Sequence, residues 1–273
     1  MTSTFLSRRL TLACLGSALL LAACGKPAEP AATAAAASQP EAAPAPRVIV
    51  VGTDPVYPPF EWQDDKGEIV GFEIDLMKAI AERAGLQVKF VATPWEGMFN
   101  ALAQGDRDAL MHAITITEER KPTMDFTEPY FDASQLIAVP LDAKVSSMAD
   151  LKKLRVAVQT GTTGDEVVSK LLGKTNPLIR RFESIPLALR ELEAGGVNAV
   201  VADNGLVAHY VANNGQRFKT VSDPTFVPEQ YGIVVKKGNA ELLAKLNEGL
   251  AKVRADGTHA KLMTQYFGDA IGR

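Results

Sequence analysis

Short apolar runs that alternate with amphipathic segments begin near residue 48, and this alternation restricts the fold more than any other feature. The run 48–51 (Val-Ile-Val-Val) has the continuity of a strand that is buried on both faces. The segment 72–80 then places apolar residues at helical spacing, and the run 88–91, a short helix at 95–105 and the run 108–113 follow. This β-α-β-α-β order predicts a parallel sheet covered by helices.

A second unit of the same kind follows the apolar run 136–141. Two similar α/β units in one chain predict two lobes that face each other. After residue 229 the chain returns to a strand-like run and then to two amphipathic helices, whose apolar sides need a sheet to cover. The second unit has strand-like runs at 154–158, 179–182 and 199–202, and helical segments at 165–172 and 184–193.

The first 46 residues have a different character. Arg8 and Arg9 precede an apolar stretch that is too short for a resident transmembrane helix. It ends in Leu-Ala-Ala-Cys-Gly at 21–25, which resembles a bacterial lipobox and predicts a signal peptide at 1–23 and lipidation of Cys24. A plain secretory signal is the alternative. Residues 24–46, rich in Ala and Pro, are expected to form a tether without a packed core.

Composition excludes several classes of site. The only cysteines are Cys14 and Cys24, so after cleavage and lipidation no disulfide or redox pair remains. The formal net charge is −3 and no basic block is present, so nucleic acid is not an expected partner. The three histidines are scattered along the chain, and neither a metal site nor a cofactor is expected.

The stretch that follows the run 108–113 combines threonines with one arginine. It reads Thr115-x-Thr117-x-x-Arg120, and it follows the carboxyl end of a predicted strand, where ligands bind in open α/β sheets. An arginine at this edge presents a planar set of donors that matches a carboxylate. The alternative is a surface arginine paired with Glu118 or Asp125.

This stretch, continued by Asp125-Phe126-Thr127-x-Pro129-Tyr130, resembles the signature of bacterial solute-binding protein family 3, the amino-acid-binding proteins that feed ABC importers. Further matching motifs occur in the family's order along residues 47–268. The nearest likeness is to glutamine- and histidine-binding periplasmic proteins. These motifs are Gly52-Thr53-Asp54-Pro55-x-Tyr57-x-Pro59-Phe60-Glu61, Gly71-Phe72-Glu73-Ile74-Asp75-Leu76, Gln159-Thr160-Gly161-Thr162-Thr163 and Ala255-Asp256-Gly257-Thr258.

The resemblance implies a two-lobed periplasmic binding protein fold of type II, in class α/β. Each lobe would be a mostly parallel sheet flanked by helices, with a cleft between the lobes. The chain would cross twice, so that lobe I contains residues 47–132 and 229–273 and lobe II contains residues 133–228. It further implies a lipid-anchored monomer in the periplasm that delivers an amino acid to a membrane-embedded ABC permease.

The resemblance also implies the ligand-binding residues. Arg120 would bind the α-carboxylate, helped by backbone N–H groups around Thr163, and Thr115 would accept from the ammonium or donate to the carboxylate. Asp203, from the opposite lobe, would accept from the ammonium, although a helix N-cap is its alternative role. The remaining expected pocket residues are Asp54, Tyr57, Phe60, Trp95, His112, Ala113, Gln159 and Thr162.

Selectivity for the ligand side chain is assigned to few residues. Asp54 and Gln159 are the polar residues expected to contact the ligand side chain, which favours polar or basic amino acids over acidic ones. His112 departs from the small residue that is common in the family, and packing is the alternative for Phe60. We expect a binding protein without catalytic residues. The rival interpretations are a cyclohexadienyl-dehydratase-like enzyme, with Asp54 or His112 as its general acid, and a receptor sensor or lytic-enzyme module.

Overall fold

The computed structural model describes residues 47–268. The predicted signal peptide, the tether and Cys24 lie outside the described residues. Within that range, no helix combines the length and the apolar character needed to cross a bilayer.

The first sheet has five strands, of which four point in the same direction. β1 pairs in parallel with β5 and β6, whereas β15 runs antiparallel to both of its neighbours, β6 and β7. In sheet order the strands are β5 (Gln87–Ala92), β1 (Val48–Thr53), β6 (Ala109–Leu110), β15 (Val234–Lys236) and β7 (Met124–Phe126).

The second sheet repeats this arrangement. β10 is parallel to β11 and β12, and β9 runs antiparallel to its neighbours β12 and β13. The predicted α/β class with two mostly parallel sheets is therefore confirmed. In sheet order the strands are β11 (Ile179–Phe182), β10 (Val156–Gln159), β12 (Ala199–Asp203), β9 (Gln135–Pro140) and β13 (Phe218–Val221).

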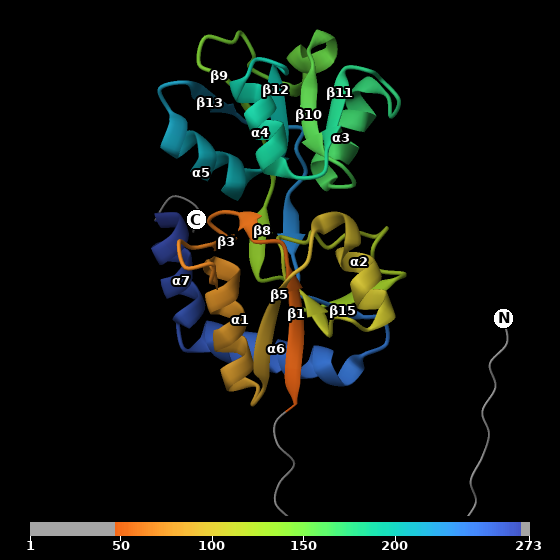
Figure 1. Cartoon of the computed structure of the whole chain (residues 1–273), viewed down its shortest axis with the longest axis vertical. Coiled ribbons are helices and arrows are strands. Elements are labelled where there is room, and N and C mark those ends of the chain that lie inside the picture. Colours follow the sequence, from red (N-terminus) through yellow and green to blue (C-terminus); the bar gives the residue numbers. More distant parts are fainter. Residues whose placement is uncertain (1–46, 269–273) are drawn as a thin grey trace, which may run out of the picture. The chain divides into compact units, whose positions relative to one another are not determined.

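Two segments run side by side between the sheets (Figure 1). They are β8 (Phe131–Ala133) and β14 (Glu229–Tyr231), which pair in an antiparallel fashion. The reversed strand of each sheet, β9 or β15, comes soon after one of these crossings in the chain. We call the part with the first sheet lobe I and the part with the second sheet lobe II; the exact residue limits given above remain a prediction.

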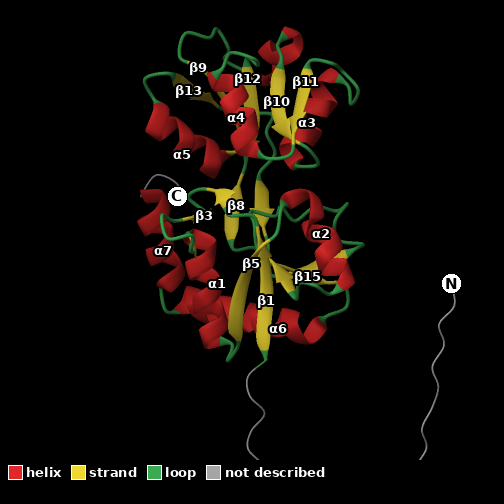
Figure 2. Cartoon of the chain, viewed as in Figure 1, coloured by secondary structure: helices red, strands yellow, loops and turns green. Residues whose placement is uncertain are grey.

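Helices flank both sheets (Figure 2). In lobe I, α1 and α6 approach closely, because a Cβ added at Gly249 of α6 would lie 2.4 Å from the carbonyl oxygen of Ile80 in α1. The helices of lobe I are α1 (Phe72–Arg83), α2 (Trp95–Gln104), α6 (Ala240–Ala255) and α7 (Thr258–Phe267). Those of lobe II are the 3-10 helix η1 (Met148–Lys153), α3 (Thr163–Leu172), α4 (Ile185–Glu193) and α5 (Asn204–Asn214).

The turn between α6 and α7 is held by polar contacts. Asp256 Oδ1 accepts the backbone N–H of Thr258 at 2.9 Å, and Asp256 Oδ2 accepts from Arg83 Nε at 2.6 Å. The hydrogen bonds from Thr258, followed by that from Arg83, lower the pKa of Asp256 from 3.8 to about 2. These contacts fix the direction in which α7 leaves α6.

A small three-stranded sheet, which the sequence did not predict, follows β1. It consists of β2 (Val56–Tyr57), β3 (Glu61–Gln63) and β4 (Ile69–Val70). It brings Tyr57 toward lobe II, because Tyr57 OH donates a hydrogen bond to Asp203 at 3.0 Å.

Candidate functional site

The carboxyl ends of strands from both sheets meet at one pocket. β1, β5 and β6 end beside it in lobe I, and β10 and β12 end beside it in lobe II. This is the edge at which open α/β sheets bind ligands. Ten of the twelve predicted ligand-binding residues line the pocket: Tyr57, Trp95, His112, Ala113, Thr115, Arg120, Gln159, Thr162, Thr163 and Asp203.

Arg120 lines the pocket from lobe I and retains free donors. Its Nη1 donates to the carbonyl oxygen of Thr115 at 2.8 Å, and its Nη2 donates to that of Gly161 in lobe II at 3.4 Å. The guanidinium carbon lies 5.4 Å from the ring centroid of Trp95 and 5.6 Å from that of Phe99, within cation–π range. A guanidinium carries five N–H groups, so three remain, which is enough for a bidentate carboxylate. Burial lowers the pKa of Arg120.

Asp203 stands at the carboxyl end of β12 and is buried. Its Oδ2 accepts from Tyr231 OH at 2.6 Å and from Tyr57 OH, and its Oδ1 accepts from Gln135 Nε2 at 2.6 Å. Burial, followed by the charge of Glu229, raises the pKa of Asp203, while the three hydrogen bonds oppose this shift. Its side chain makes no hydrogen bond to the backbone of α5, although it precedes that helix.

Thr162 and Thr163 form the start of α3. Thr162 is the N-cap, and its Oγ1 accepts the backbone N–H of Asp165 at 3.3 Å. The first N–H groups of a helix have no partner within the helix and favour an anion. This helix end can therefore help to hold a carboxylate beside Arg120.

Trp95 closes the pocket from the side of α2. Its indole Nε1 donates to the carbonyl oxygen of Thr160 in lobe II at 3.0 Å, and its backbone N–H donates to Asp54 Oδ2 at 3.1 Å. Asp54 thus supports the start of α2 and is not among the lining residues. Gln159 lines the pocket and donates one amide proton to the carbonyl oxygen of Glu183 at 3.1 Å.

The side chain of His112 contacts a group of buried acids on the side away from the pocket. His112 Nδ1 is hydrogen-bonded to Glu61 Oε1. Glu73 Oε1 accepts from the backbone N–H of Ala113 at 2.8 Å and from Tyr130 OH at 2.5 Å. Burial lowers the pKa of His112 and raises the pKa of both Glu61 and Glu73. The bond to Glu61 therefore holds the imidazole in a fixed orientation against the pocket.

Ala113 has an uncommon backbone conformation. Its φ is 45°, in the left-handed region that residues other than glycine rarely adopt. Its N–H is held by Glu73, so the buried acid stabilises the turn that presents residues 112–115 to the pocket. Such strained residues cluster at functional sites.

Phe60 does not line the pocket. Its side chain is fully buried, and its ring lies 5.0–6.2 Å from five other aromatic rings. It therefore belongs to the core beneath β2, as its alternative role predicted. The five rings are those of Tyr57, Phe72, Phe131, Tyr231 and Phe267.

Two residues that sequence reasoning missed, Glu229 and Gln135, form hydrogen bonds with residues of the site. Glu229 Oε2 accepts from Thr115 Oγ1 at 2.7 Å and from Thr163 Oγ1 at 2.8 Å, and its Oε1 accepts from Gln135 Nε2 at 3.0 Å. Gln135 also donates to Asp203. Glu229 lies in the three-residue strand β14 between the lobes, and Gln135 is the first residue of β9 in lobe II, so no hydrophobic period reveals that these side chains point inward.

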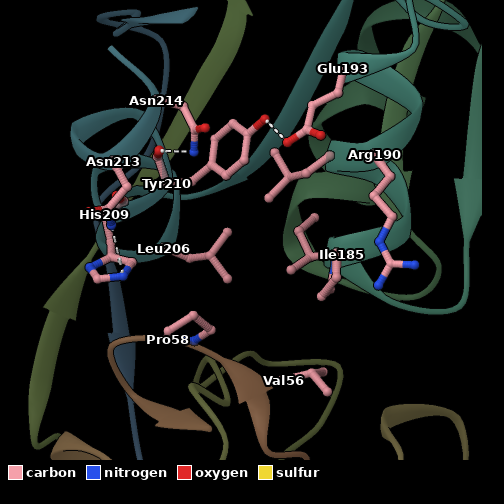
Figure 3. A pocket seen from close by; sticks show the side chains of 12 residues that line it. Val56, Pro58, Ile185, Arg190, Glu193, Leu206, His209, Tyr210, Asn213 and Asn214 are labelled. Carbon is pink, nitrogen blue, oxygen red and sulfur yellow. Dashed lines mark hydrogen bonds between the residues drawn. The ribbon is translucent and has the colours of Figure 1, made fainter.

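A second, larger cavity of ≈ 320 Å³ lies elsewhere between the lobes (Figure 3). Val56 and Pro58 of lobe I face α4 and α5 of lobe II across it. Its interior is mainly apolar, and its acid, Glu193, is exposed and accepts from Tyr210 OH at 2.7 Å. The smaller pocket, which joins a buried acid to an arginine with free donors, is therefore the better candidate for a charged ligand.

The chain resembles known binding proteins over most of its length. A family model described as bacterial extracellular solute-binding proteins, family 3, matches residues 49–269. A probable histidine-binding protein from Neisseria gonorrhoeae is 45% identical over 266 residues, which are 96% of this chain and 95% of that protein. The ABC transporter arginine-binding protein 1 of Escherichia coli is 32% identical over 224 residues, 80% of this chain and 90% of that protein.

A solved structure agrees with the arrangement of the lobes. The arginine-, lysine-, histidine-binding protein ArtJ from Geobacillus stearothermophilus superposes with a TM-score of 0.79 at 39% identity. The match covers 82% of this chain and 96% of that one. The predicted two-lobed binding-protein fold is thereby confirmed.

Proposed function

Because the chain belongs to the bacterial extracellular solute-binding proteins of family 3, we propose that it captures a polar or basic L-amino acid for an ABC importer. The observation that carries this proposal is the position of Arg120 and Asp203, which line one pocket from opposite lobes. An amino acid is a zwitterion, and these two side chains complement its carboxylate and its ammonium. No ion pair joins Arg120 to Asp203 in residues 47–268, so both charges remain available.

The charges around the pocket favour a basic ligand. Arg120 supplies one positive charge and the carboxylates of Asp203 and Glu229 supply two negative ones. A ligand without net charge would leave one negative charge uncompensated, whereas a cationic side chain would neutralise it. The relatives described above are named as binding histidine, arginine or lysine, which supports a basic amino acid as the ligand.

Capture would proceed by closure of the lobes. Bonds from Tyr57 to Asp203 and from Trp95 to Thr160 already join the two lobes around the pocket. The enclosed volume is ≈ 20 Å³, room for about one water, so an amino acid enters only when the lobes part. A ligand that touches both lobes favours the closed form by its differential affinity.

The cellular setting is part of the proposal. The family is extracytoplasmic, and we infer that lipid on Cys24 anchors the chain to a membrane while residues 24–46 act as its tether. A membrane-embedded ABC permease is the partner that would receive the amino acid. The binding protein acts as a monomer, since one chain supplies both faces of the pocket.

The dehydratase interpretation requires a general acid in the pocket. Asp54 is not among the lining residues and accepts the N–H of Trp95. The Nδ1 atom of His112 is bonded to Glu61, and burial lowers the pKa of this imidazole. Neither group is a poised acid, and we propose binding without chemical conversion. Incubation of the purified protein with arogenate or prephenate tests this, and turnover would refute it.

A thermal-shift screen against the twenty amino acids tests the function directly. A ligand at one hundred times its Kd stabilises the native state by about 2.7 kcal/mol. We expect a clear rise in melting temperature with L-arginine, L-lysine or L-histidine and none with L-glutamate. A rise with L-glutamate alone, or with no amino acid, would refute the proposed function.

A further inference from the structure

The Glu229 carboxylate joins a hydroxyl from each lobe through a single oxygen atom. Oε2 lies 2.7 Å from Thr115 Oγ1 in lobe I and 2.8 Å from Thr163 Oγ1 in lobe II. Glu229 itself belongs to the crossing strand β14. It is not among the residues that line the pocket, whereas both threonines are. The carboxylate therefore lies behind the two hydroxyls as seen from the pocket.

The chemistry of these bonds fixes where the hydroxyl protons are. A carboxylate only accepts hydrogen bonds, and a threonine hydroxyl has one proton and two lone pairs. Each threonine therefore donates its proton to Glu229. Each hydroxyl then has only lone pairs available for a ligand. Thr115 and Thr163 can therefore accept a hydrogen bond in the pocket but cannot donate one.

Gln135 extends the same arrangement to Asp203. Its Nε2 has two protons, and it lies 2.6 Å from Asp203 Oδ1, 3.0 Å from Glu229 Oε1 and 3.2 Å from Thr163 Oγ1. A bond from Gln135 to Thr163 occupies one of the two lone pairs of that hydroxyl, so one remains for the pocket. This amide orientation is required, because a carbonyl oxygen in the same place would face two carboxylates. Gln135 thus separates two like charges and holds both acids on the same side of the pocket.

We propose that Glu229 is a positioning residue for the ligand's α-ammonium: it takes the hydroxyl protons of Thr115 and Thr163 and presents their lone pairs to the pocket beside Asp203. This rests on the proposed function, because it assumes an amino acid ligand. It also assigns the role of Thr115 that the sequence left open, which is to accept from the ammonium. Because the two hydroxyls lie on different lobes, the complete ammonium site exists only when the lobes are closed.

The experiment compares an amino acid with an analogue that lacks the α-ammonium. Isothermal titration calorimetry measures L-arginine and its α-hydroxy analogue, which keeps the carboxylate and the guanidinium, on wild-type protein and on Glu229→Gln. The variant should bind L-arginine at least about tenfold more weakly. The preference for L-arginine over the analogue should fall by a similar factor. If another amino acid gives the larger thermal shift, the same pair is made from that one.

Matched variants separate positioning from a general effect on the crossing strands. Asp132→Asn removes an exposed acid from β8, where it faces Gln230 of β14, and it should change neither affinity nor preference. Thr115→Val keeps the side-chain shape but lacks the acceptor, so it should reproduce the loss of preference even if the Glu229 variant does not fold.

Each outcome has one meaning. The proposal for Glu229 is overturned if the variants lose affinity equally for L-arginine and for its analogue. It is also overturned if Glu229→Gln and Thr115→Val keep the wild-type preference for L-arginine over the analogue. Both results leave the proposed function intact. Failure of the wild-type protein to bind any amino acid refutes the proposed function itself.

Discussion

Replacing Arg120 by methionine should remove most of the affinity for an amino acid. The side chain keeps its length and part of its contact with the Trp95 ring, but loses the guanidinium. Two of the five N–H groups serve the carbonyl oxygens of Thr115 and Gly161, so the other three are available for a bidentate carboxylate. Hydrogen bonds to charged groups contribute about 1.5–3 kcal/mol each. Loss of two such bonds should weaken binding by about 10²- to 10⁴-fold.

Calorimetry with L-arginine and L-histidine measures this loss. Arg120→Lys should retain part of the affinity, because an ammonium keeps the charge but cannot form the paired bonds. The matched control is Arg217→Met, since Arg217 also lies over an aromatic ring, that of Phe218 at 5.0 Å, and is not a pocket residue. An Arg120→Met protein that binds within threefold of wild type would refute the assignment of the carboxylate site.

Three further predictions follow from packing, titration and closure. In urea denaturation, Gly249→Ala should lower the free energy of unfolding by about 1–3 kcal/mol, because the new methyl group would meet a carbonyl oxygen of α1. The control is Gly97→Ala in α2, where nothing lies within 4 Å of the added Cβ. This control should leave the free energy of unfolding unchanged or raise it. Asp256 has a folded-state pKa below its ordinary 3.8, so its contribution is fully present above that pH and is lost as the pH falls through about 2. Asp256→Asn should therefore be less stable than wild type at pH 7, and thermal melts should show this difference shrinking as the pH falls from 3.8 toward 2. Trp95→Phe loses the bond to Thr160 across the lobes, and its Kd should rise about 2- to 12-fold; an unchanged Kd would mean that this bond does not stabilise the closed form.

The sequence predicted the fold well because the pattern of this chain is local. Continuous apolar runs of three or four residues mark the strands β1, β10 and β12, and helical spacing marks α1 and α6. The order of these elements determines which strand ends share an edge. The resemblance to solute-binding protein family 3 then assigned Arg120 and Asp203 to one pocket, whereas the residues alone had left a surface ion pair and a helix N-cap as alternatives.

Other features depend on contacts that no local pattern encodes. Glu61 and Glu73 are fully buried acids, yet each follows an aromatic residue in a segment that reads as a polar turn or a helix start. Glu229 reaches the site from β14, whose pairing with β8 is too short to show a period, and Gln135 reaches it from the first position of β9. Asp54 was assigned to the ligand, but its carboxylate is used by the backbone of Trp95. In each case at least one partner lies 40 or more residues away in the chain.

The position of β15 has a consequence for how the chain acquires its structure. This strand lies between β6 and β7, although more than 100 residues separate it from both in the sequence. Lobe II is built from one continuous stretch and can form as soon as that stretch is available, whereas the first sheet stays divided until residues 234–236 arrive. We therefore expect the lobe that begins the chain to be the last to complete its folding, and refolding of the first sheet to lag behind that of the second.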